Sequence, residues 1–485
     1  MPGPTRKFVS SAAEILLLAA LVVFFALTAL RLHAQVVGGT LSGVVTDPSG
    51  AALSEASVVV HNDETGNERR LTTGPDGRFS APSIPIGTYT ISAEHPGFTA
   101  QRRIGIPLTI GQSKQIDLQL TVDSVKQQVT VEDTPAVVNV STQQTSGLID
   151  ERQIKQLPLN GRSYDQLITL NPAVVNYTGQ RSGSIGTSNS SVGNMFAISG
   201  RRPQDNLFLL NGVEYTGASL INVTPGGTSG QLLGVDAVRE FNVVTDTYSA
   251  SYGKRQGAQI SIVTGSGTNH LHGSAYEFLR NSALDSRNYF DQTHIPEFQR
   301  NNFGGSLGGP IRRDKLFLFA NYEGYRQNLG LSDVTFVPDT QARQGYLPDP
   351  ANPSGPRKNY GVAQGVAPLF NLWPTQNGPA LLDANGNPTG IALAYSNPMQ
   401  HIREDFATTR FDYNISPNDL FFAVYTVDDS TADTPTQNPL ASITKIFERR
   451  SQVYRSNTSF LHACSILLAS AFRVPHSSSW VLRRR

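Results

Sequence analysis

Residues able to carry out chemistry are sparse in this chain of 485 residues. His270 and His272 are two positions apart, a spacing that places both imidazoles on one face of a β-strand, where they could bind a metal ion. No third ligand lies near them in sequence, so we interpret them as an interface or barrel-lumen pair. Cys464 is the single cysteine, which excludes an intramolecular disulfide and a cysteine-rich zinc site.

The motifs of common enzymes are absent from the sequence. It has no phosphate-binding loop, no G-x-S-x-G nucleophile motif and no H-x-x-E spacing of a zinc carboxypeptidase. The formal net charge of +1 predicts no nucleic-acid partner. We therefore expect a protein that is not an enzyme, with no catalytic residue, no metal and no cofactor.

The composition favours short strands joined by turns. Charged residues make up 16%, against about 25% in typical soluble domains, whereas Gly (43) and Pro (29) are frequent. At the N-terminus, Arg6 and Lys7 precede the apolar run 15–30. We expect residues 1–34 to be a signal peptide cleaved after Ala34, with an uncleaved anchor as the alternative. No later apolar run is long enough for a membrane-spanning helix.

The first segment, residues 38–122, predicts a small β-sandwich. Apolar and polar residues alternate over 88–93 and 115–120, and 47–50 (Asp-Pro-Ser-Gly) is a turn signal. The segment resembles the carboxypeptidase regulatory-like domain, a fold grouped with carbohydrate-binding-like sandwiches. The resemblance does not by itself indicate a sugar site. The matching pattern is carried by Gly43, Val45, Asp47, Gly50, Leu53, Gly77, Phe79, Pro85, Gly87 and Tyr89.

Residues 123–144 form a linker with an extended, β-branched stretch that can pair with a sheet edge of another protein. This stretch resembles the energy-coupling box that precedes the plug of TonB-dependent receptors. An ordinary linker strand is the alternative. The residues of the possible box are Gln128, Val129, Thr130, Val131 and Glu132.

The second segment, residues 145–268, has two short helical patterns before Pro158 and Pro172 and then a buried strand ending in a turn. The strand reads DNLFLLNGVEYTG over 205–217, and we expect Leu207, Leu209 and their neighbours to face the core. The turn consists of Asn211, Gly212 and Val213, where an Asn-Gly pair tolerates positive φ.

This segment resembles the plug domain of TonB-dependent outer-membrane receptors, in the Oar-like group with an N-terminal regulatory-like domain. The family usually has Asp-Gly-Val where this chain has Asn211-Gly212-Val213, which puts a carboxylate contact there in doubt. The matching blocks are 157–162, 199–206, 210–213, 238–241 and 258–269.

The third segment, residues 269–454, contains amphipathic strands typical of a transmembrane β-barrel. Phe411, Tyr413 and Ile415 alternate with polar residues, and a similar alternation covers 316–326. Strands of a soluble sandwich are the alternative. We expect 337–400 to be an extracellular loop, six to ten strands in all, and an atypical tail at 455–485 from a truncated or out-of-frame end.

The fold class is thus mainly β: a sandwich, a mixed α/β plug and a partial antiparallel barrel. The resemblance implies a TonB-dependent receptor-like protein of the Gram-negative outer membrane, with the sandwich in the periplasm. Its partners would be a TonB-type energy-coupling protein, outer-membrane lipid and an extracellular oligosaccharide, peptide or metal chelate. The alternative is a surface adhesion or carbohydrate-binding protein anchored in that membrane. An extracellular peptidase is disfavoured by the missing ligands.

Overall fold

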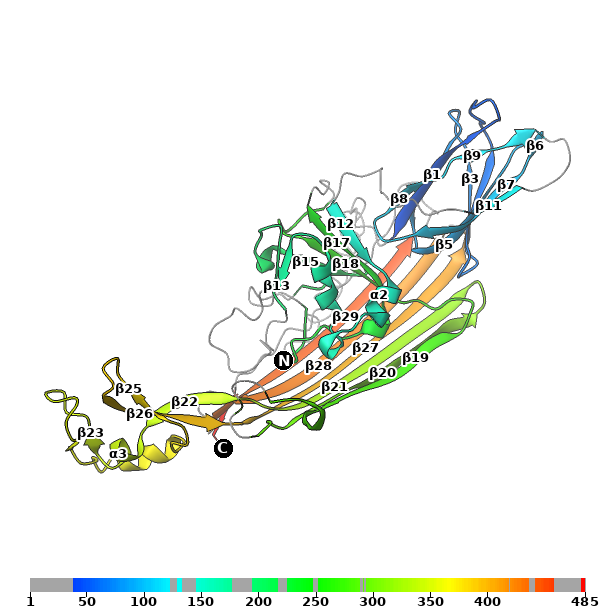
Figure 1. The fold of residues 1–485 in the computed structure, drawn as a ribbon. Helices are drawn as coiled ribbons and strands as arrows, with labels where there is room; N and C mark the ends of the chain where they lie inside the picture. The colour runs from blue at the N-terminus through cyan, green and yellow to red at the C-terminus, as the bar shows by residue number, and fades with distance from the viewer. Residues whose placement is uncertain are drawn as a thin grey trace, which may run out of the picture.

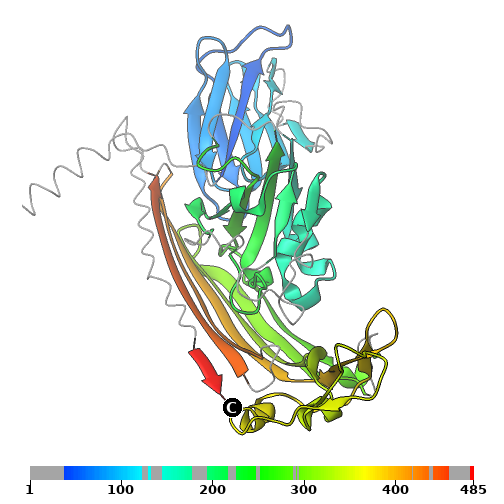
Figure 2. The same cartoon turned by 90° about the vertical axis from the view of Figure 1, so that its left-hand side faces the viewer.

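The computed structural model contains a β-sandwich, a central domain and a long curved antiparallel sheet (Figure 1). The curved sheet bends around one side of the central domain, and the sandwich lies at one end of both (Figure 2). The structure describes residues 38–122, 129–132, 145–176, 194–216, 225–246, 252–287, 291, 294–417, 419–435, 441–457 and 481–484. The expected signal peptide and residue Gln128 lie outside these residues.

The sandwich packs two sheets face to face. One sheet has the order β4-β1-β8, with β9 also paired to β1, and the other has the order β11-β7-β5-β2-β3. Along β1 buried and half-buried residues alternate, so one face of the strand fills the core. The strand bounds are β1 Gly39–Thr46, β2 Ser57–Asn62, β3 Glu68–Thr72, β4 Arg78–Ile84, β5 Gly87–Glu94, β7 Gln101–Leu108, β8 Ser113–Gln115, β9 Leu118–Gln119 and β11 Val129–Glu132, with the pair β6 Phe98–Thr99 and β10 Thr121–Val122 beside them.

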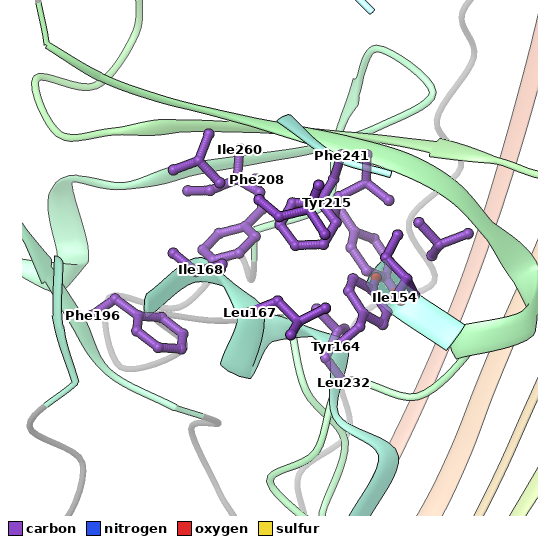
Figure 3. Close-up of a cluster of buried hydrophobic side chains, with 14 of the residues drawn as sticks. Ile154, Tyr164, Leu167, Ile168, Phe196, Phe208, Tyr215, Leu232, Phe241 and Ile260 are labelled. Carbon is purple, nitrogen blue, oxygen red and sulfur yellow. The ribbon is translucent and has the colours of Figure 1, made fainter. Parts of the chain in front are cut away.

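The central domain is built on a mixed sheet of order β12-β17-β18-β15-β16, in which only β15 and β18 run parallel. Short helical segments cover one face, and aromatic side chains fill the space between them (Figure 3). The bounds are β12 Thr145–Ile149, α2 Glu151–Gln156, β15 Leu207–Leu210, β16 Val213–Glu214, β17 Val238–Asp246 and β18 Gln259–Thr264. Further segments are the strand pair β13 Val174–Asn176 and β14 Phe196–Ile198, and the 3₁₀ turns Asn160–Arg162, Tyr164–Leu170, Pro203–Asp205 and Val235–Ala237.

The helix α2 begins and ends where its sequence dictates. Asp150 caps it by accepting the Gln153 N–H at 2.8 Å, while the Gln153 side chain accepts the Asp150 N–H at 3.0 Å. This reciprocal pair satisfies two backbone donors that a helix start leaves free. The helix stops just before Leu157, whose α conformation is disfavoured by Pro158. The second predicted helix is instead the 3₁₀ segment Tyr164–Leu170.

The strand β15 is buried on both faces, which corrects one expectation. Phe208 and Leu210 belong to the main core, whereas Leu207 and Leu209 are buried on the opposite face of the sheet. Of the residues expected to face the core, the neighbours Phe208 and Leu210 do so, and Leu207 and Leu209 do not. A continuous apolar run carries no alternation from which the core-facing set can be identified.

The curved sheet has its strands in sequence order, each antiparallel to the next. Short turns join β20 to β21 and β27 to β28 at the end near the sandwich, and the long connection from β21 to β27 lies at the other end (Figure 1). The bounds are β19 His272–Asn281, β20 Phe298–Arg312, β21 Leu316–Gly330, β27 Met399–Ser416, β28 Asp419–Pro435, β29 Ala441–Asn457 and β30 Val481–Arg484.

The two faces of this sheet differ in chemistry. Phe317, Asn321 and Glu323 of β21 are at most 5% exposed, and their alternating neighbours Leu318 and Tyr322 are 39% and 41% exposed. The face toward the central domain therefore carries the polar Asn321 and Glu323 as well as Phe317, whereas apolar side chains are exposed on the outer face, an arrangement typical of an outer-membrane strand. Among the described residues, no helix is both long and apolar enough to cross a membrane.

The stretch expected as a loop at 337–400 is a folded insertion at the end of the sheet far from the sandwich (Figure 1). Its small sheet, of order β22-β26-β25, buries Val337, Ala392 and Ala394, and Asp339 accepts hydrogen bonds from Arg357 at 2.7 and 2.5 Å. The elements are β22 Asp333–Pro338, α3 Thr340–Arg343, β23 Tyr346–Leu347, β24 Lys358–Asn359, the 3₁₀ turn Ala367–Leu372, β25 Ala380–Leu382 and β26 Pro388–Ser396.

The histidine pair is not placed on one strand face. His270 precedes β19, which begins at His272, and the His270 carbonyl lies 3.0 Å from Nδ1 of His272. Instead, the His272 ring stacks on Phe319 at 6.4 Å between ring centroids. The strand therefore starts two residues too late for the arrangement that the spacing suggested.

The turn between β15 and β16 generates a first prediction. Asn211 has φ of 50° and Gly212 has φ of 81°, which is the two-residue turn that matches the twist of a hairpin. We expect Gly212→Ala to lower the free energy of unfolding by about 1–2 kcal/mol, because a Cβ is disfavoured at positive φ. Gly212→Asn should cost less, and Gly253→Ala, at a position with open space and ordinary φ, should be neutral. Urea unfolding in detergent, followed by circular dichroism, measures all three; equal midpoints for Gly212→Ala and Gly253→Ala would contradict the prediction.

A buried carboxyl in the same domain generates a second prediction. Asp165 is 1% exposed and accepts hydrogen bonds from Ser163 at 2.5 Å and Asn194 at 3.0 Å. Burial raises the pKa of Asp165 from 3.8 to about 6, against the lowering effect of these two donors. The folded protein thus binds more protons than the unfolded protein between these values, so stability should fall as pH rises from about 4 to about 6.

Asp165→Asn should remove this part of the pH dependence, and Asp76→Asn, at an exposed turn of the sandwich, should leave it in place. Urea midpoints measured from pH 4 to pH 7 for the three proteins provide the comparison. Parallel pH profiles for the original protein and Asp165→Asn would show that Asp165 is not the titrating group.

Candidate functional site

The inner face of the curved sheet presents buried carboxylates to the central domain. Glu323 and Glu404 are fully buried, and Asp428 is 3% exposed. They come from three neighbouring strands, β21, β27 and β28. A buried charge is costly unless a cation or hydrogen-bond donors compensate it, so these side chains require partners from the central domain.

Arg162 is the cation that the central domain supplies. It forms an ion pair with Asp236 of its own domain and donates to Oε1 of Glu323 at 3.4 Å. Its guanidinium lies 3.9 Å from the ring centroid of Tyr276 and 4.8 Å from that of Phe278, both on β19. One side chain thus joins the central domain to two barrel strands through charge and cation–π contacts.

The backbone at Arg162 has an unusual conformation. Gly161 has φ of 76°, and Arg162 itself has φ of 56°, a conformation that residues other than glycine rarely adopt. The 3₁₀ turn Asn160–Arg162 lies between Pro158, which ends the preceding helix, and the next 3₁₀ segment. Such strain persists only where the surroundings impose it, and here the contacts of the guanidinium do so.

Backbone donors of the central domain add to this compensation. The Gly234 N–H donates to Oε2 of Glu323 at 2.9 Å, and the Ser229 N–H donates to Oε2 of Glu404 at 3.0 Å. A Cβ at Gly227 would lie 2.5 Å from the Glu404 carboxylate, so a residue without a side chain is needed for this approach. The segment 225–234 therefore lies against the inner face of the sheet through its main chain.

A second set of contacts connects the turn predicted from the sequence to the curved sheet, called the barrel sheet below. The Asn211 side chain is 2% exposed, and its Oδ1 accepts the Thr264 N–H at 3.1 Å. Arg410 of β27 donates to the Thr264 carbonyl at 3.2 Å. Asn211, Gly212 and Val213 thus close one end of the central sheet, and the neighbouring strand continues the contact to the barrel.

A third contact joins the central domain to the sandwich. The Glu240 carboxylate is 7% exposed and accepts the Ile110 N–H at 2.6 Å. Burial raises the pKa of Glu240 to about 7, although the Ile110 N–H and the nearby Arg239 both favour the ionised form.

The possible coupling box is placed on the sandwich. Val129–Glu132 forms β11, which pairs in parallel with residues 101–104 of β7 and occupies the edge of that sheet in the described part of the chain. The turn residues 211–213 lie in a different domain, so the structure does not bring the two predicted sets together.

The residues that join the domains were missed by the sequence reasoning. The sequence pattern places Arg162 only within the block 157–162 and Glu323 only at a polar position of 316–326, and it does not single out Glu404. The available signal was a charged residue, Glu323, on the polar face of an amphipathic strand. Its partner Arg162 lies 161 residues away in the sequence, so no local pattern connects the two. Within the described residues, no group of three or more His, Cys, Asp or Glu is arranged to hold a metal ion.

Comparison with known families agrees with this architecture. Residues 40–121 match the family model of the carboxypeptidase regulatory-like domain, and residues 263–472 match that of an outer membrane beta barrel domain. These matches confirm the prediction of a β-sandwich followed by an outer-membrane β-barrel domain. The protein is therefore located in the outer membrane.

Proteins with similar sequences or structures align with only part of this chain. The TonB-dependent transporter Oar of Myxococcus xanthus is 23% identical over 300 residues, which are 58% of this chain and 26% of that protein. The outer membrane transporter YddB from Escherichia coli is 15% identical with a TM-score of 0.42, over 65% of this chain and 37% of that chain. A ferric enterobactin receptor mutant from Pseudomonas aeruginosa is 14% identical with a TM-score of 0.35, over 64% and 40%.

The matched region of this chain spans about a quarter of the length of the curated relative. The order of its domains and the matched sequence together relate this chain to that transporter. The chain is a homologue of the TonB-dependent transporter Oar, and it carries a carboxypeptidase regulatory-like domain ahead of an outer membrane β-barrel domain.

Proposed function

We propose that the protein acts as a TonB-dependent receptor-type transporter, in which the central domain, residues 145–268, is the plug of the barrel. The observation that carries this proposal is the contact of Arg162 and of the 225–234 main chain with the buried carboxylates Glu323 and Glu404. These contacts hold a separately folded domain against the inner face of a barrel sheet, where it obstructs passage.

The chemistry of this interface suits a barrier that must move. When the two surfaces separate, water replaces the lost ion pairs and hydrogen bonds. The net free energy needed to break them is therefore smaller than their strength in isolation. An apolar interface of the same size would lose all of its stabilisation on hydration. A polar, hydrogen-bonded contact can therefore keep the plug in place and still release it when a partner applies work.

The coupling step is assigned to residues 128–132. In this proposal the strand β11, at the edge of its sheet, offers its backbone to a strand of a TonB-type energy-coupling protein, since unpaired edge groups favour strand addition. The other proposed segments of the chain are the signal peptide at 1–34, the periplasmic sandwich at 38–122, the linker at 123–144, the barrel from 269 to 454 and the tail at 455–485.

The substrate side is the end of the barrel sheet that carries the folded insertion. Exposed aromatic side chains lie there, with Phe336 63%, Tyr360 53% and Trp373 46% exposed. We propose that an extracellular oligosaccharide, peptide or metal chelate first contacts this insertion. The same aromatic residues favour the second candidate function, adhesion or carbohydrate binding at the cell surface, which would need no coupling protein.

Binding of the coupling protein separates the two functions. We expect the purified periplasmic domain of the TonB-type protein to bind the full chain, and Val131→Pro to weaken this binding at least about tenfold, because proline removes a backbone donor from the strand. Val131→Thr keeps that donor and should bind as the original chain does. Surface plasmon resonance on detergent-solubilised protein measures the affinity, and equal affinities for the two variants would refute the assigned coupling segment.

A further prediction concerns the contact that holds the plug. Arg162→Ala leaves Glu323 and Asp236 buried without their cation, which should cost about 3–5 kcal/mol of the stability of the plug in the barrel. Adding Glu323→Gln to Arg162→Ala should restore part of this loss, because it removes the uncompensated charge. Urea-induced exposure of the central domain to a protease measures the effect.

The control is Lys155→Ala, which breaks the exposed ion pair of Lys155 with Glu151 on α2 and should cost less than about 1 kcal/mol. Indistinguishable protease resistance for Arg162→Ala and Lys155→Ala would mean that the buried ion pair does not hold the plug.

A further inference from the structure

One turn of the sandwich contacts both other domains. This is the turn at residues 62–67, between β2 and β3. Its Glu64 carboxylate accepts two hydrogen bonds from Arg239 of the central domain, at 2.6 and 2.7 Å. Its Glu64 carbonyl accepts the N–H of Asn269, the residue that leads into the barrel sheet, at 2.9 Å.

The turn is rigid enough to act as a fixed element. The Asn62 side chain is 4% exposed, and its Oδ1 accepts the N–H groups of Glu64 at 3.0 Å and Thr65 at 2.9 Å. At Gly66, which has φ of 68°, a Cβ would lie 2.2 Å from Oδ1 of Asp314, in the turn between β20 and β21. The turn therefore fits closely against the rim of the barrel sheet.

Apolar packing and a backbone hydrogen bond extend this contact. Ile86 and Ile110 of the sandwich form one buried cluster with Val263 of the central domain. The Ile110 N–H donates to Glu240. The apolar cluster is small, so the charged pair of Glu64 and Arg239 contributes a large part of the specificity of this docking.

A cavity of about 80 Å³ lies beside the charged pair and is lined by all three domains. The lining is mixed, and its charged side chains include Glu64, Arg239 and Asp412. A cavity of this size has room for water, which can take over the hydrogen bonds of the pair as the domains separate. The docking is thus suited to reversible opening. Lining residues from the three domains include Glu64, Tyr89, Arg239, Val263, Arg410 and Phe422.

The candidate coupling strand belongs to the same domain as the turn. β11 pairs with β7, and β2, which leads into the turn, is two strands away from β7 in that sheet. The linker that follows β11, residues 133–144, can extend to about 40 Å at most. Until it is fully extended, a pull on β11 is carried by the sandwich sheet and reaches the central domain through the contacts of the turn.

We propose that the turn 62–67 is a latch: its docking on Arg239 and on the rim of the barrel sheet holds the central domain in the closed position, and undocking of the sandwich is the first step of opening. This inference rests on the proposed plug function of the central domain. It adds the regulatory-like domain as the element that controls release.

Cysteine labelling of the full chain in detergent tests the latch without any coupling protein, in a Cys464→Ser background. Val263→Cys reports on the interface between the sandwich and the central domain, where Val263 is 2% exposed. Ala237→Cys reports on the interface between the central domain and the barrel, where Ala237 is 1% exposed and packs with Tyr325 and Phe406. Labelling of a buried thiol by a maleimide measures the population of the open state.

We expect Glu64→Gln to raise the labelling rate at position 263 about tenfold, the effect of losing one charge-assisted contact, and to raise the rate at position 237 with it. The charge exchange Glu64→Arg with Arg239→Glu should return both rates toward the original values. Glu68→Gln is the matched control, since Glu68 contacts Arg70 and His61 on the sandwich alone, and it should change neither rate.

An unchanged rate at position 263 in Glu64→Gln would show that the pair does not hold the sandwich. A raised rate at position 263 with an unchanged rate at position 237 would show that the sandwich docks but does not control the central domain. Either outcome overturns the latch. Failure of the coupling protein to bind at residues 128–132 would instead refute the proposed function and leave these labelling rates as they are.

Discussion

The polar inner face of the barrel sheet is the constraint on which the rest of the structure depends. The inner strands β21, β27 and β28, which are 15 to 18 residues long, pair with a neighbour on each side over nearly their whole length, so their backbone groups are satisfied within the sheet. Their side chains alternate between the outer face and the interior, and the interior positions include carboxylates such as Glu323 and Glu404. Once a folded domain excludes water from them, only that domain can provide the compensating groups.

The central domain meets part of this requirement with few side chains. Arg162 provides the charge, and the main chain of 225–234 provides hydrogen-bond donors. Main-chain donors fix position without demanding a particular side chain, and glycine at 227 and 234 permits the close approach. Unusual backbone conformations gather here, at Gly161, Arg162 and Gly234, because the contacts with the barrel determine the path of the chain.

The sequence predicted features that depend on neighbouring residues. The alternation around Phe411 and Tyr413 indicated a strand with one apolar face, and the same residues lie on the outer face of β27. The sandwich also followed from local turns and alternation. The ion pair of Arg162 with Glu323 joins distant parts of the chain, and no local pattern encodes it. Likewise, the register of β15 and the fold of the insertion depend on tertiary packing, which a continuous apolar run or a loop-rich composition does not determine.

The three domains converge on one rim of the barrel sheet, and this convergence connects the local contacts to motion. Arg239 and Glu240 are consecutive in β17, and they contact the sandwich through Glu64 and Ile110. The same strand follows directly on the 3₁₀ turn that carries Asp236, the partner of Arg162. A displacement of the sandwich is therefore transmitted along a few residues of one strand to the ion pair in the barrel interior. Packed strands and buried ion pairs shift between discrete arrangements rather than deforming gradually, so the docked sandwich and the closed central domain are expected to change state together.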